Sequence, residues 1–330
     1  MQEKQVAEVE LVPDLAHPTD EWAGINPSPK EMGLVSFTLD KGVKTTVVGT
    51  VYGMDFDIEH EGYRVKAYFD HYNKRLKIVD YEAKDYRAML LRMAWLADQN
   101  GFTKIFVKAV HEDFQQFLSH GYMMEGLIKY YFQGQDAYIL SRFSSQKRVR
   151  SDSLIEEAKM VEKLVYNAPV RDPRTLPAEF RIVQAKEQDI PDLVVIYRQV
   201  FETYPSPLTN PDYIKASMER NVIYRLAYLG DRAVAAASAE MDLKHSNAEM
   251  TDCATIPEVQ GKGLMQHLLM ALEKDLVDYK VHSAYTLARA VSFGMNRVFF
   301  RLGYEFCGRL INNCDIFGQF EDMNIWVKRL

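Results

Sequence analysis

One stretch of this chain reads Thr251-Asp-Cys-Ala-Thr-Ile-Pro-Glu-Val-Gln-Gly-Lys-Gly-Leu-Met-Gln266. It predicts a strand, a turn with two glycines and the first turn of a helix, because leucine then recurs at positions 264, 268, 272 and 276. Gly261 and Gly263 permit backbone conformations that a Cβ forbids, and they let a ligand approach the main chain. The N–H groups and the positive dipole end of the helix favour a phosphate or pyrophosphate. The alternative is an ordinary glycine turn between a strand and a helix.

The composition is that of a globular protein long enough for two domains. The chain has 330 residues, of which 47% are hydrophobic and 26% are charged. The net charge is −6, and the basic run at residues 146–150 is short, so we expect no nucleic-acid partner. No apolar run approaches the roughly 18 residues that span a bilayer, and no leader peptide is recognisable, so we expect no membrane partner.

The three cysteines do not suggest a disulfide framework or a metal site. They are Cys253, Cys307 and Cys314, and their spacing matches neither pattern. We therefore expect a cytoplasmic protein that holds no metal.

An internal repeat organises the chain. Residues 117–126, Phe-Leu-Ser-His-Gly-Tyr-Met-Met-Glu-Gly, match residues 299–308, Phe-Phe-Arg-Leu-Gly-Tyr-Glu-Phe-Cys-Gly, at Phe, Gly, Tyr and Gly. A helix and a strand are predicted before each copy, and a strand pair after it. The glycine turn is present only in the second copy, because the corresponding junction in the first reads Tyr81-Glu-Ala-Lys-Asp-Tyr-Arg87. We infer a degenerate first copy without an anion site.

Composition shifts divide the chain into four predicted segments. They are a proline-rich irregular arm (1–33), a first α/β domain (34–143), a helical linker (144–178) and a second α/β domain (179–330). In the first domain, strands are predicted at 44–48, 63–69, 75–81 and 104–109, with helices at 86–100 and 113–119. In the second, strands are predicted at 180–184, 223–229, 233–243, 248–255 and 283–290, with helices at 189–201, 211–219 and 296–302.

The second domain resembles the GNAT family of acetyl-CoA-dependent N-acetyltransferases. The family's glycine loop is similar to Gln260-Gly261-Lys262-Gly263-Leu264-Met265, with Met265 in place of the last glycine. The resemblance implies tandem GNAT-like domains of class α/β (α+β), each a mixed, mostly antiparallel sheet flanked by helices. It implies acetyl-CoA as co-substrate, with its pyrophosphate on the amides of residues 261–266, including Gln266. It also implies that Cys253, Ala254 and Thr255 pair with the pantetheine arm in the manner of an added strand.

A narrower resemblance concerns five phrases between residues 252 and 324. They are Asp252-Cys-Ala-Thr255, Ala288-Arg-Ala290, Gly294-Met-Asn296, Leu310-Ile-Asn-Asn313 and Phe320-Glu-Asp-Met-Asn324. They are similar to the β-lysine ε-N-acetyltransferase family, which makes the compatible solute Nε-acetyl-β-lysine alongside a lysine 2,3-aminomutase. This resemblance implies a small cationic amino-acid substrate and a role in osmoadaptation. Lysine, a polyamine or an aminoglycoside as acceptor, a non-catalytic acyl-CoA sensor, and assembly as a homodimer stay open.

Transfer of an acetyl group requires a neutral amine, and a lysine-like ammonium has a pKa of about 10.4, so a base must remove a proton. Glu240, Glu249 and Asp252 are the candidates, with Glu240 or Asp252 preferred. Regular strand alternation predicts that Asp252 lies on the face opposite Glu249 and Cys253. Cys253 is expected to be a strand residue beside the thioester and not a covalent nucleophile, since no histidine is nearby in sequence to activate it.

The proton donor to the leaving thiolate is less defined. Many GNAT enzymes carry a tyrosine four residues before the Gly of the Gly-Phe or Gly-Tyr pair, and here that position is Phe299. Tyr304 or water could replace it, the alternative for Tyr304 being a packed core aromatic. The family's asparagine near this helix falls on Ser292, whose hydroxyl can reach CoA.

Five residues are candidates for substrate binding. Arg289 could form a fork with a substrate carboxylate, or could pair with an internal acid. Asn312 and Asn313 offer amides. Glu321 and Asp322 offer negative charge for a diamine, the alternative being a solvated turn between the last two strands.

Overall fold

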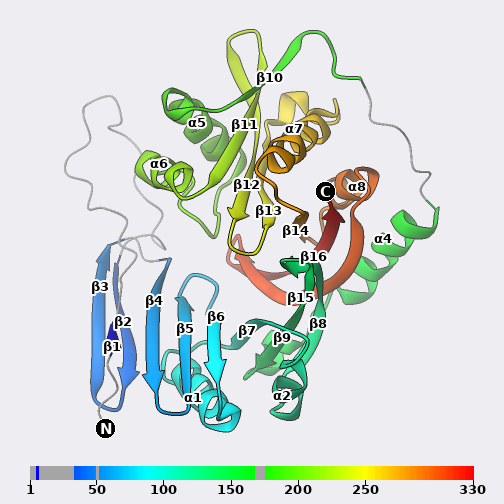
Figure 1. The fold of residues 1–330 in the computed structure, drawn as a ribbon. Helices are drawn as coiled ribbons and strands as arrows, with labels where there is room; N and C mark the ends of the chain where they lie inside the picture. The colour runs from blue at the N-terminus through cyan, green and yellow to red at the C-terminus, as the bar shows by residue number, and fades with distance from the viewer. Residues whose placement is uncertain (1–4, 7–32, 50–51, 168–174) are drawn as a thin grey trace. The chain divides into compact units, whose positions relative to one another are not determined.

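The computed structural model describes residues 5–6, 33–49, 52–167 and 175–330, which divide into two units (Figure 1). Unit 1 comprises Met1–Met124 and Leu140–Val149, and unit 2 comprises Glu125–Ile139 and Arg150–Leu330. The predicted irregular arm lies outside the described residues, except for Gln5–Val6 and Gly33.

Unit 1 is an antiparallel meander followed by a crossover helix. Its elements are β1 (Gln5–Val6), β2 (Gly33–Asp40), β3 (Val43–Gly49), β4 (Gly53–His60), β5 (Tyr63–Asp70), β6 (Arg75–Ala83), α1 (Tyr86–Gln99), β7 (Lys104–Ala109), α2 (Phe114–Ser119), the end of β9 (Gln135–Phe143) and α3 (Gln146–Val149). Strands β4, β5 and β6 pair antiparallel, and β6 pairs parallel with β7 after α1. Helix α1 buries Met89, Met93 and Leu96 completely, which provides the core of this unit.

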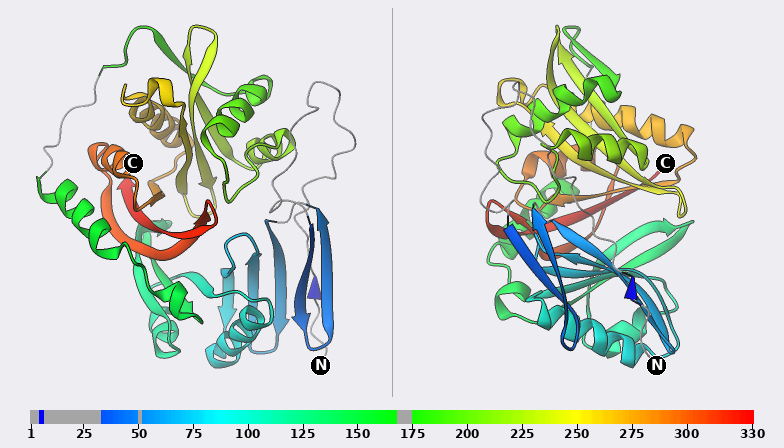
Figure 2. Two further views of the ribbon diagram at one scale, coloured as in Figure 1. Left: turned by 180° about the vertical axis from the view of Figure 1, so that it is seen from behind. Right: turned by 90° about the vertical axis from the view of Figure 1, so that its left-hand side faces the viewer.

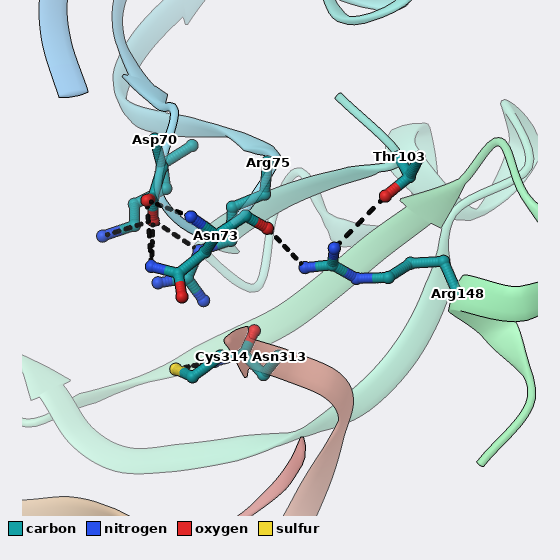
Figure 3. A network of polar contacts seen from close by, with 8 residues as sticks. Asp70, Asn73, Arg75, Thr103, Arg148, Asn313 and Cys314 are labelled. Atoms are coloured by element: carbon teal, nitrogen blue, oxygen red, sulfur yellow. Dashed lines mark hydrogen bonds and ion pairs between the residues drawn. The ribbon is translucent and has the colours of Figure 1, made fainter. Parts of the chain in front are cut away.

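A buried ion-pair network fixes the turn between β5 and β6 (Figure 3). The Asp70 carboxylate accepts hydrogen bonds from Arg75 Nε at 2.6 Å and from both the main chain and the side chain of Asn73. Burial alone would raise the pKa of Asp70, but Arg75 and Lys77 outweigh it and lower that pKa to about 2. Arg148 joins the network by donating to the Asn73 carbonyl at 2.8 Å. The network has a structural role, because the protein itself supplies the partners of this buried charge.

Unit 2 is a mostly antiparallel sheet with helices on both faces (Figures 1 and 2). Its elements are β8 (Met123–Phe132), the start of β9, α4 (Leu154–Asn167), β10 (Phe180–Gln184), α5 (Ile190–Val200), α6 (Pro211–Glu219), β11 (Val222–Leu229), β12 (Arg232–Asp242), β13 (Asn247–Thr255), α7 (Leu264–Asp278), β14 (Ser283–Arg289), α8 (Phe293–Arg301), β15 (Glu305–Ile316) and β16 (Gln319–Arg329). Its strands follow the order β8-β15-β16-β14-β13-β12-β11-β10, and β13 and β14 are its parallel pair.

The two faces of this sheet carry separate cores. Ala235, Ala237 and Ala239 of β12 pack with the leucines of α7, whereas Ala236 packs with the residues of α5. Helices therefore cover both faces at β12, which explains its nearly continuous run of small apolar residues. Below, these are called the α7 face and the α5 face.

The tandem-repeat prediction is confirmed by the strand order. The first copy has the order β4-β5-β6-β7-β9-β8, and the second has β11-β12-β13-β14-β16-β15. Helices α1 and α7 occupy the same place in the two copies, as do α2 and α8. The hairpin of β8 and β9 carries residues 125–139 of the first copy into unit 2, where Gly126 pairs with Gly308 of β15.

Most predicted helices and strands lie within a few residues of their expected places. Helix α8 begins at Phe293, three residues before the expected start at 296. Strand β4 was not expected, although Met54, Phe56 and Ile58 alternate inward and are fully buried. The outward positions of β4 are acidic, and acidic residues are depleted in strands. The sequence was therefore not recognised as a strand, although its apolar residues alternate. Among the described residues, none of the helices has the length and apolarity needed to cross a membrane.

Candidate active site

The glycine turn connects β13 to α7 as predicted. Gly261 has φ +78° and Gly263 has φ +86°, so both adopt the left-handed conformation that glycine tolerates without strain. A Cβ built on Gly261 would meet no atom within 4 Å, so the space beside the turn is open. Gln260 Nε2 donates to the Thr255 carbonyl at 3.1 Å and ties the turn to the end of the strand.

The first turn of α7 is suited to an anion. Gly263 is its N-cap residue. Within the described part of the chain no side chain caps this helix, and its first turn contains no acidic residue. Gln266 is 6% exposed, and its Nε2 donor has no hydrogen-bond partner among the described residues. A buried donor without a partner is costly, so an acceptor such as a phosphate oxygen fits here. Lys262 is half-exposed, with Nζ 4.0 Å from the Glu179 carboxylate.

The corresponding helix of the first copy is closed to an anion. At α1 the N-cap is Asp85, whose carboxylate accepts from Ala88 N at 2.9 Å. The charge and the hydrogen bond that a phosphate would supply are therefore already provided by the protein. This agrees with the prediction that the anion site belongs to the second copy.

Strands β13 and β14 are paired only at their beginnings. Their parallel register covers Asn247–Glu249 against Ser283–Tyr285, although β13 continues to Thr255 and β14 to Arg289. In the described strands, the β14-facing edge of β13 beyond Glu249 therefore has no ladder partner. Cys253, Ala254 and Thr255 lie on this stretch, so an extended ligand can pair with it as an added strand.

The expected alternation along β13 is wrong at Asp252. The register with β12 shifts between Ala236 and Ser238, and Asp252 takes φ +51°. This bulge turns the Asp252 carboxyl to the α5 face, where Ser238 Oγ donates to it at 2.6 Å. Glu249 also influences Asp252 electrostatically, and it pairs with Glu240 across the strands. All three carboxylates therefore lie on the α5 face, with Cys253 on the α7 face.

Asp252 has the properties of a proton acceptor near neutral pH. It is 7% exposed, and burial raises its pKa to about 6 against the opposing hydrogen bonds from Ser238 and Tyr204. Glu249 adds to the increase. A carboxyl with this pKa is mostly ionised at pH 7 and can still take up a proton. Glu240 is exposed, and Glu249 accepts from the Tyr285 hydroxyl at 3.1 Å.

The chemistry of Cys253 argues against a covalent nucleophile. Its side chain is half-buried, and its thiol donates to the Thr251 carbonyl at 3.6 Å. Burial, followed by the Asp252 charge, raises the pKa of this thiol well above its usual value. The thiolate form is therefore disfavoured.

Two predicted site residues, Ser292 and Tyr304, lie just outside the two ends of α8. Ser292 is the N-cap residue of α8, and its carbonyl accepts from Asn296 Nδ2 at 2.8 Å. Tyr304 is 2% exposed and packs edge-to-face on Phe299 at 5.1 Å between ring centroids. Burial and the nearby Glu273 carboxylate raise the pKa of Tyr304 well above its usual value. Tyr304 is thus a core aromatic, and its phenol would lose its proton only with difficulty.

The predicted substrate residues lie on β14, β15 and β16. Arg289 forms the predicted fork, but with an internal acid: its Nε and Nη2 each donate to Glu321 at 2.7 Å. Asp322 is 2% exposed and accepts from Asn312 N at 2.7 Å. The solvated-turn alternative is therefore wrong, because Glu321 and Asp322 lie within β16. Asn313 is also buried, beside Cys314 (Figure 3).

A buried carboxyl on α4 was not predicted from the sequence. Glu157 is 3% exposed and lies 3.5 Å from Arg309 Nη1. Burial raises its pKa to about 8, helped by the contact with Asp322 and opposed by Arg309. Glu157 therefore keeps its proton at neutral pH, because a second buried negative charge at this place is disfavoured. In sequence, Glu157 is one of several acids on a charged helix, and no local signal distinguishes it.

Comparison with known proteins agrees with this geometry. The acetyltransferase (GNAT) family matches residues 190–304. The N-acetyltransferase YodP of Bacillus subtilis (strain 168) is 37% identical over 268 residues, which covers 81% of this chain and 97% of that protein. The β-lysine N(6)-acetyltransferase of Methanosarcina mazei is 38% identical and covers 71% of this chain and 94% of that protein. The β-lysine N(6)-acetyltransferase of Methanococcus maripaludis is 35% identical, and the match covers 74% of this chain and 89% of that protein. A match over nearly the whole of such relatives, together with a glycine turn, an uncapped helix and a divergent strand pair, means that this chain belongs to the GNAT family of N-acetyltransferases.

Proposed function

We propose that this protein transfers the acetyl group of acetyl-CoA to the ε-amine of β-lysine. The observation that carries the donor assignment is the start of α7, where Gly261 opens the turn and Gln266 presents an unpaired buried donor. The acceptor assignment rests on the relatives named for β-lysine N(6)-acetylation and on the arrangement of Arg289 and Glu321.

The donor is proposed to lie along two features of the second copy. The amides of residues 261–266 hold the pyrophosphate, since they combine left-handed glycines with the positive end of a helix. The edge of β13 from Cys253 to Thr255 pairs with the pantetheine arm, and one of its N–H groups polarises the thioester carbonyl. Ser292 adds a hydroxyl near the start of α8. Acetyl-CoA supplies the activated acyl group.

The acceptor amine is proposed to be deprotonated on the α5 face. Taking a proton from an ammonium of pKa about 10.4 at neutral pH costs about 4 to 5 kcal/mol, so a base is required. Asp252 and Glu240 are the proposed bases, both on this face near the unpaired edge of β13. A thiolate is a tolerable leaving group, so proton donation by Tyr304 or water contributes less than the base.

The other end of the substrate is proposed to replace part of the Arg289–Glu321 pair. A β-amino acid carries a carboxylate and an ammonium two carbons apart, and this pair offers a matching fork and acid. Asn312, Asn313 and Asp322 hold the strand segments behind it, since Asp322 accepts from the Asn312 main chain. A polyamine lacks the carboxylate and would leave the Arg289 fork unused.

Release of CoA thiol, measured with β-lysine, α-lysine and spermidine, tests this function. We expect the highest kcat/KM with β-lysine. Arg289→Lys keeps the charge but loses the fork, so it should raise KM for β-lysine about tenfold or more and leave KM for acetyl-CoA unchanged. Preference for another amine would reject the β-lysine assignment. Absence of thiol release with every amine would favour an acyl-CoA sensor.

We propose further that the product serves as a compatible solute in the cytoplasm, with a lysine 2,3-aminomutase supplying the substrate. This follows from the β-lysine assignment and from the resemblance that led to it. Accumulation of Nε-acetyl-β-lysine at high external salt, lost on deletion of this protein, would support it.

A further inference from the structure

A cluster of buried hydroxyl groups surrounds Asp252. Ser238 of β12 donates to its carboxyl at 2.6 Å, and Tyr204, in the loop between α5 and α6, lies close enough to the carboxyl to lower its pKa by hydrogen bonding. The Tyr204 hydroxyl also lies 3.5 Å from Thr251 Oγ1. These contacts depend on the bulge in β13, because regular alternation would turn Asp252 to the α7 face.

Tyr204 is the more accessible of the groups that bond Asp252. Its side chain is half-buried, whereas Ser238 is 0% exposed and Asp252 is 7% exposed. Burial, followed by the Asp252 charge, raises the pKa of Tyr204 well above its usual value, so the phenol keeps its proton. Of the two side chains that interact with the Asp252 carboxyl in this cluster, that of Tyr204 is therefore the one with appreciable exposed surface.

The cluster also includes the buried hydroxyl of Tyr197. Tyr197 of α5 is 0% exposed, and its hydroxyl has no hydrogen-bond partner among the described residues. Asp252 and Tyr204 both influence it electrostatically, which places the hydroxyl close to them. An unpaired buried hydroxyl is destabilising, so a nitrogen or a water that bonds to it would be stabilised. Tyr224 differs, since its hydroxyl is 2.8 Å from Ser217 Oγ.

We propose that Tyr204 relays the acceptor's proton to Asp252, which makes Tyr204 a catalytic residue and Asp252, rather than Glu240, the base. This inference rests on the proposed function. The ammonium gives a proton to the Tyr204 oxygen while Tyr204 gives its own proton to the Asp252 carboxylate. The amine becomes neutral, the carboxylate becomes a carboxylic acid and Tyr204 ends as a phenol.

The remaining protons balance in the transfer step. The C–N bond forms, the C–S bond breaks, and the sulfur leaves with the electron pair. A second N–H proton leaves the nitrogen and neutralises the thiolate. The Asp252 proton then returns to solvent through Tyr204. The titratable groups that interact electrostatically with Asp252 include Tyr197 (α5), Tyr204 (loop), Tyr224 (β11) and Glu249 (β13), and also the adjacent Cys253 on the opposite face of β13.

The test compares two variants of the full chain that each remove one hydrogen bond to Asp252. Both Tyr204→Phe and Ser238→Ala should move the acidic limb of the kcat–pH profile to higher pH, because both bonds lower the pKa of that carboxyl. Tyr204→Phe should also lower the alkaline plateau of kcat at least tenfold, since the relay is cut. Ser238→Ala should keep the alkaline plateau of kcat within about threefold of the wild-type value. Tyr224→Phe, a buried phenol bonded elsewhere, should change neither the limb nor the plateau.

The outcomes separate the relay from the proposed function. An unreduced kcat plateau in Tyr204→Phe, with wild-type enzyme active on β-lysine, would overturn the relay alone. Equal plateau losses in Tyr204→Phe and Ser238→Ala would also overturn it, because a structural effect on Asp252 would then explain both. If the wild type releases no thiol with any amine, the proposed function itself fails. Thermal melting of all variants identifies any that are misfolded, and Tyr204→Trp then serves as a second, non-relaying substitution.

Discussion

At the scale of the residue, the site depends on carboxyl groups whose environments differ. Asp252 has a pKa raised to about 6, Glu157 has one raised to about 8, and Asp70 has one lowered to about 2. Burial by itself raises the pKa of all three carboxyl groups, but the cations beside Asp70 outweigh burial there and lower its pKa. Three acids that look alike in sequence are therefore a proton acceptor, an acid that keeps its proton at neutral pH and a structural anion.

The raised pKa of Glu157 predicts a pH-dependent stability. In the unfolded chain Glu157 titrates near the ordinary glutamate pKa of about 4.3, whereas the folded protein keeps the proton up to about pH 8. Between these values the folded state binds more protons than the unfolded state, so stability falls as pH rises. Glu157→Gln imitates the protonated form and should remove this part of the fall.

Thermal melting between pH 6 and 8.5 checks this prediction. Asp252 has the same sign of dependence, but its effect ends near pH 6, so the upper range isolates Glu157. Glu162→Gln, an exposed acid on the same helix, is the matched control and should follow the wild type. Parallel curves for wild type and Glu157→Gln would contradict the raised pKa of Glu157.

At the scale of the element, the two copies use the same helix position differently. Helix α1 is capped by the Asp85 carboxylate, and α7 is capped by no side chain. One residue at the N-cap thus separates a helix that closes its own N-terminus from one that can receive an anion.

Gly263→Asp and Gly263→Asn test this difference at α7. The two side chains have nearly the same size and tolerate the left-handed conformation similarly, so they differ mainly in charge. Gly263→Asp should raise KM for acetyl-CoA about tenfold more than Gly263→Asn does, because its carboxylate repels the pyrophosphate. The melting temperatures should be similar for the two. Equal KM values would show that no anion of the donor lies at this helix end.

At the scale of the whole molecule, the repeat has a structural consequence within unit 2. Gly126 of the first copy and Gly308 of the second are equivalent positions, and they pair with each other across β8 and β15. A Cβ on Gly308 would lie 2.4 Å from Gly126 Cα and 2.5 Å from the Glu125 carbonyl oxygen. Both glycines are therefore required by a close approach of two backbones.

Gly308→Ala should destabilise the protein by about 2–4 kcal/mol, from overpacking together with its left-handed φ of +141°. Gly294→Ala in α8 is the control, since a Cβ there meets nothing within 4 Å and alanine favours a helix. Urea unfolding of the two variants measures the difference. A Gly308→Ala protein as stable as the control would mean that β8 and β15 separate readily.

The sequence was sufficient to predict the repeat, the glycine turn, most helices and strands, and the family. These features depend on local periodicity, on the positions of glycine residues and on short sequence motifs. For Arg289 the sequence left open a substrate carboxylate or an internal acid as partner, and it did not identify that acid as Glu321. The face of Asp252 was predicted wrongly, because a bulge is set by the register with β12 and not by the residues of β13 alone. Glu157, Tyr197 and Tyr204 gave no signal, since they reach the site from helices and loops distant in sequence. The sequence thus determined which backbone can hold an anion, whereas tertiary packing decided which carboxyl groups are buried together and so where a proton can be held.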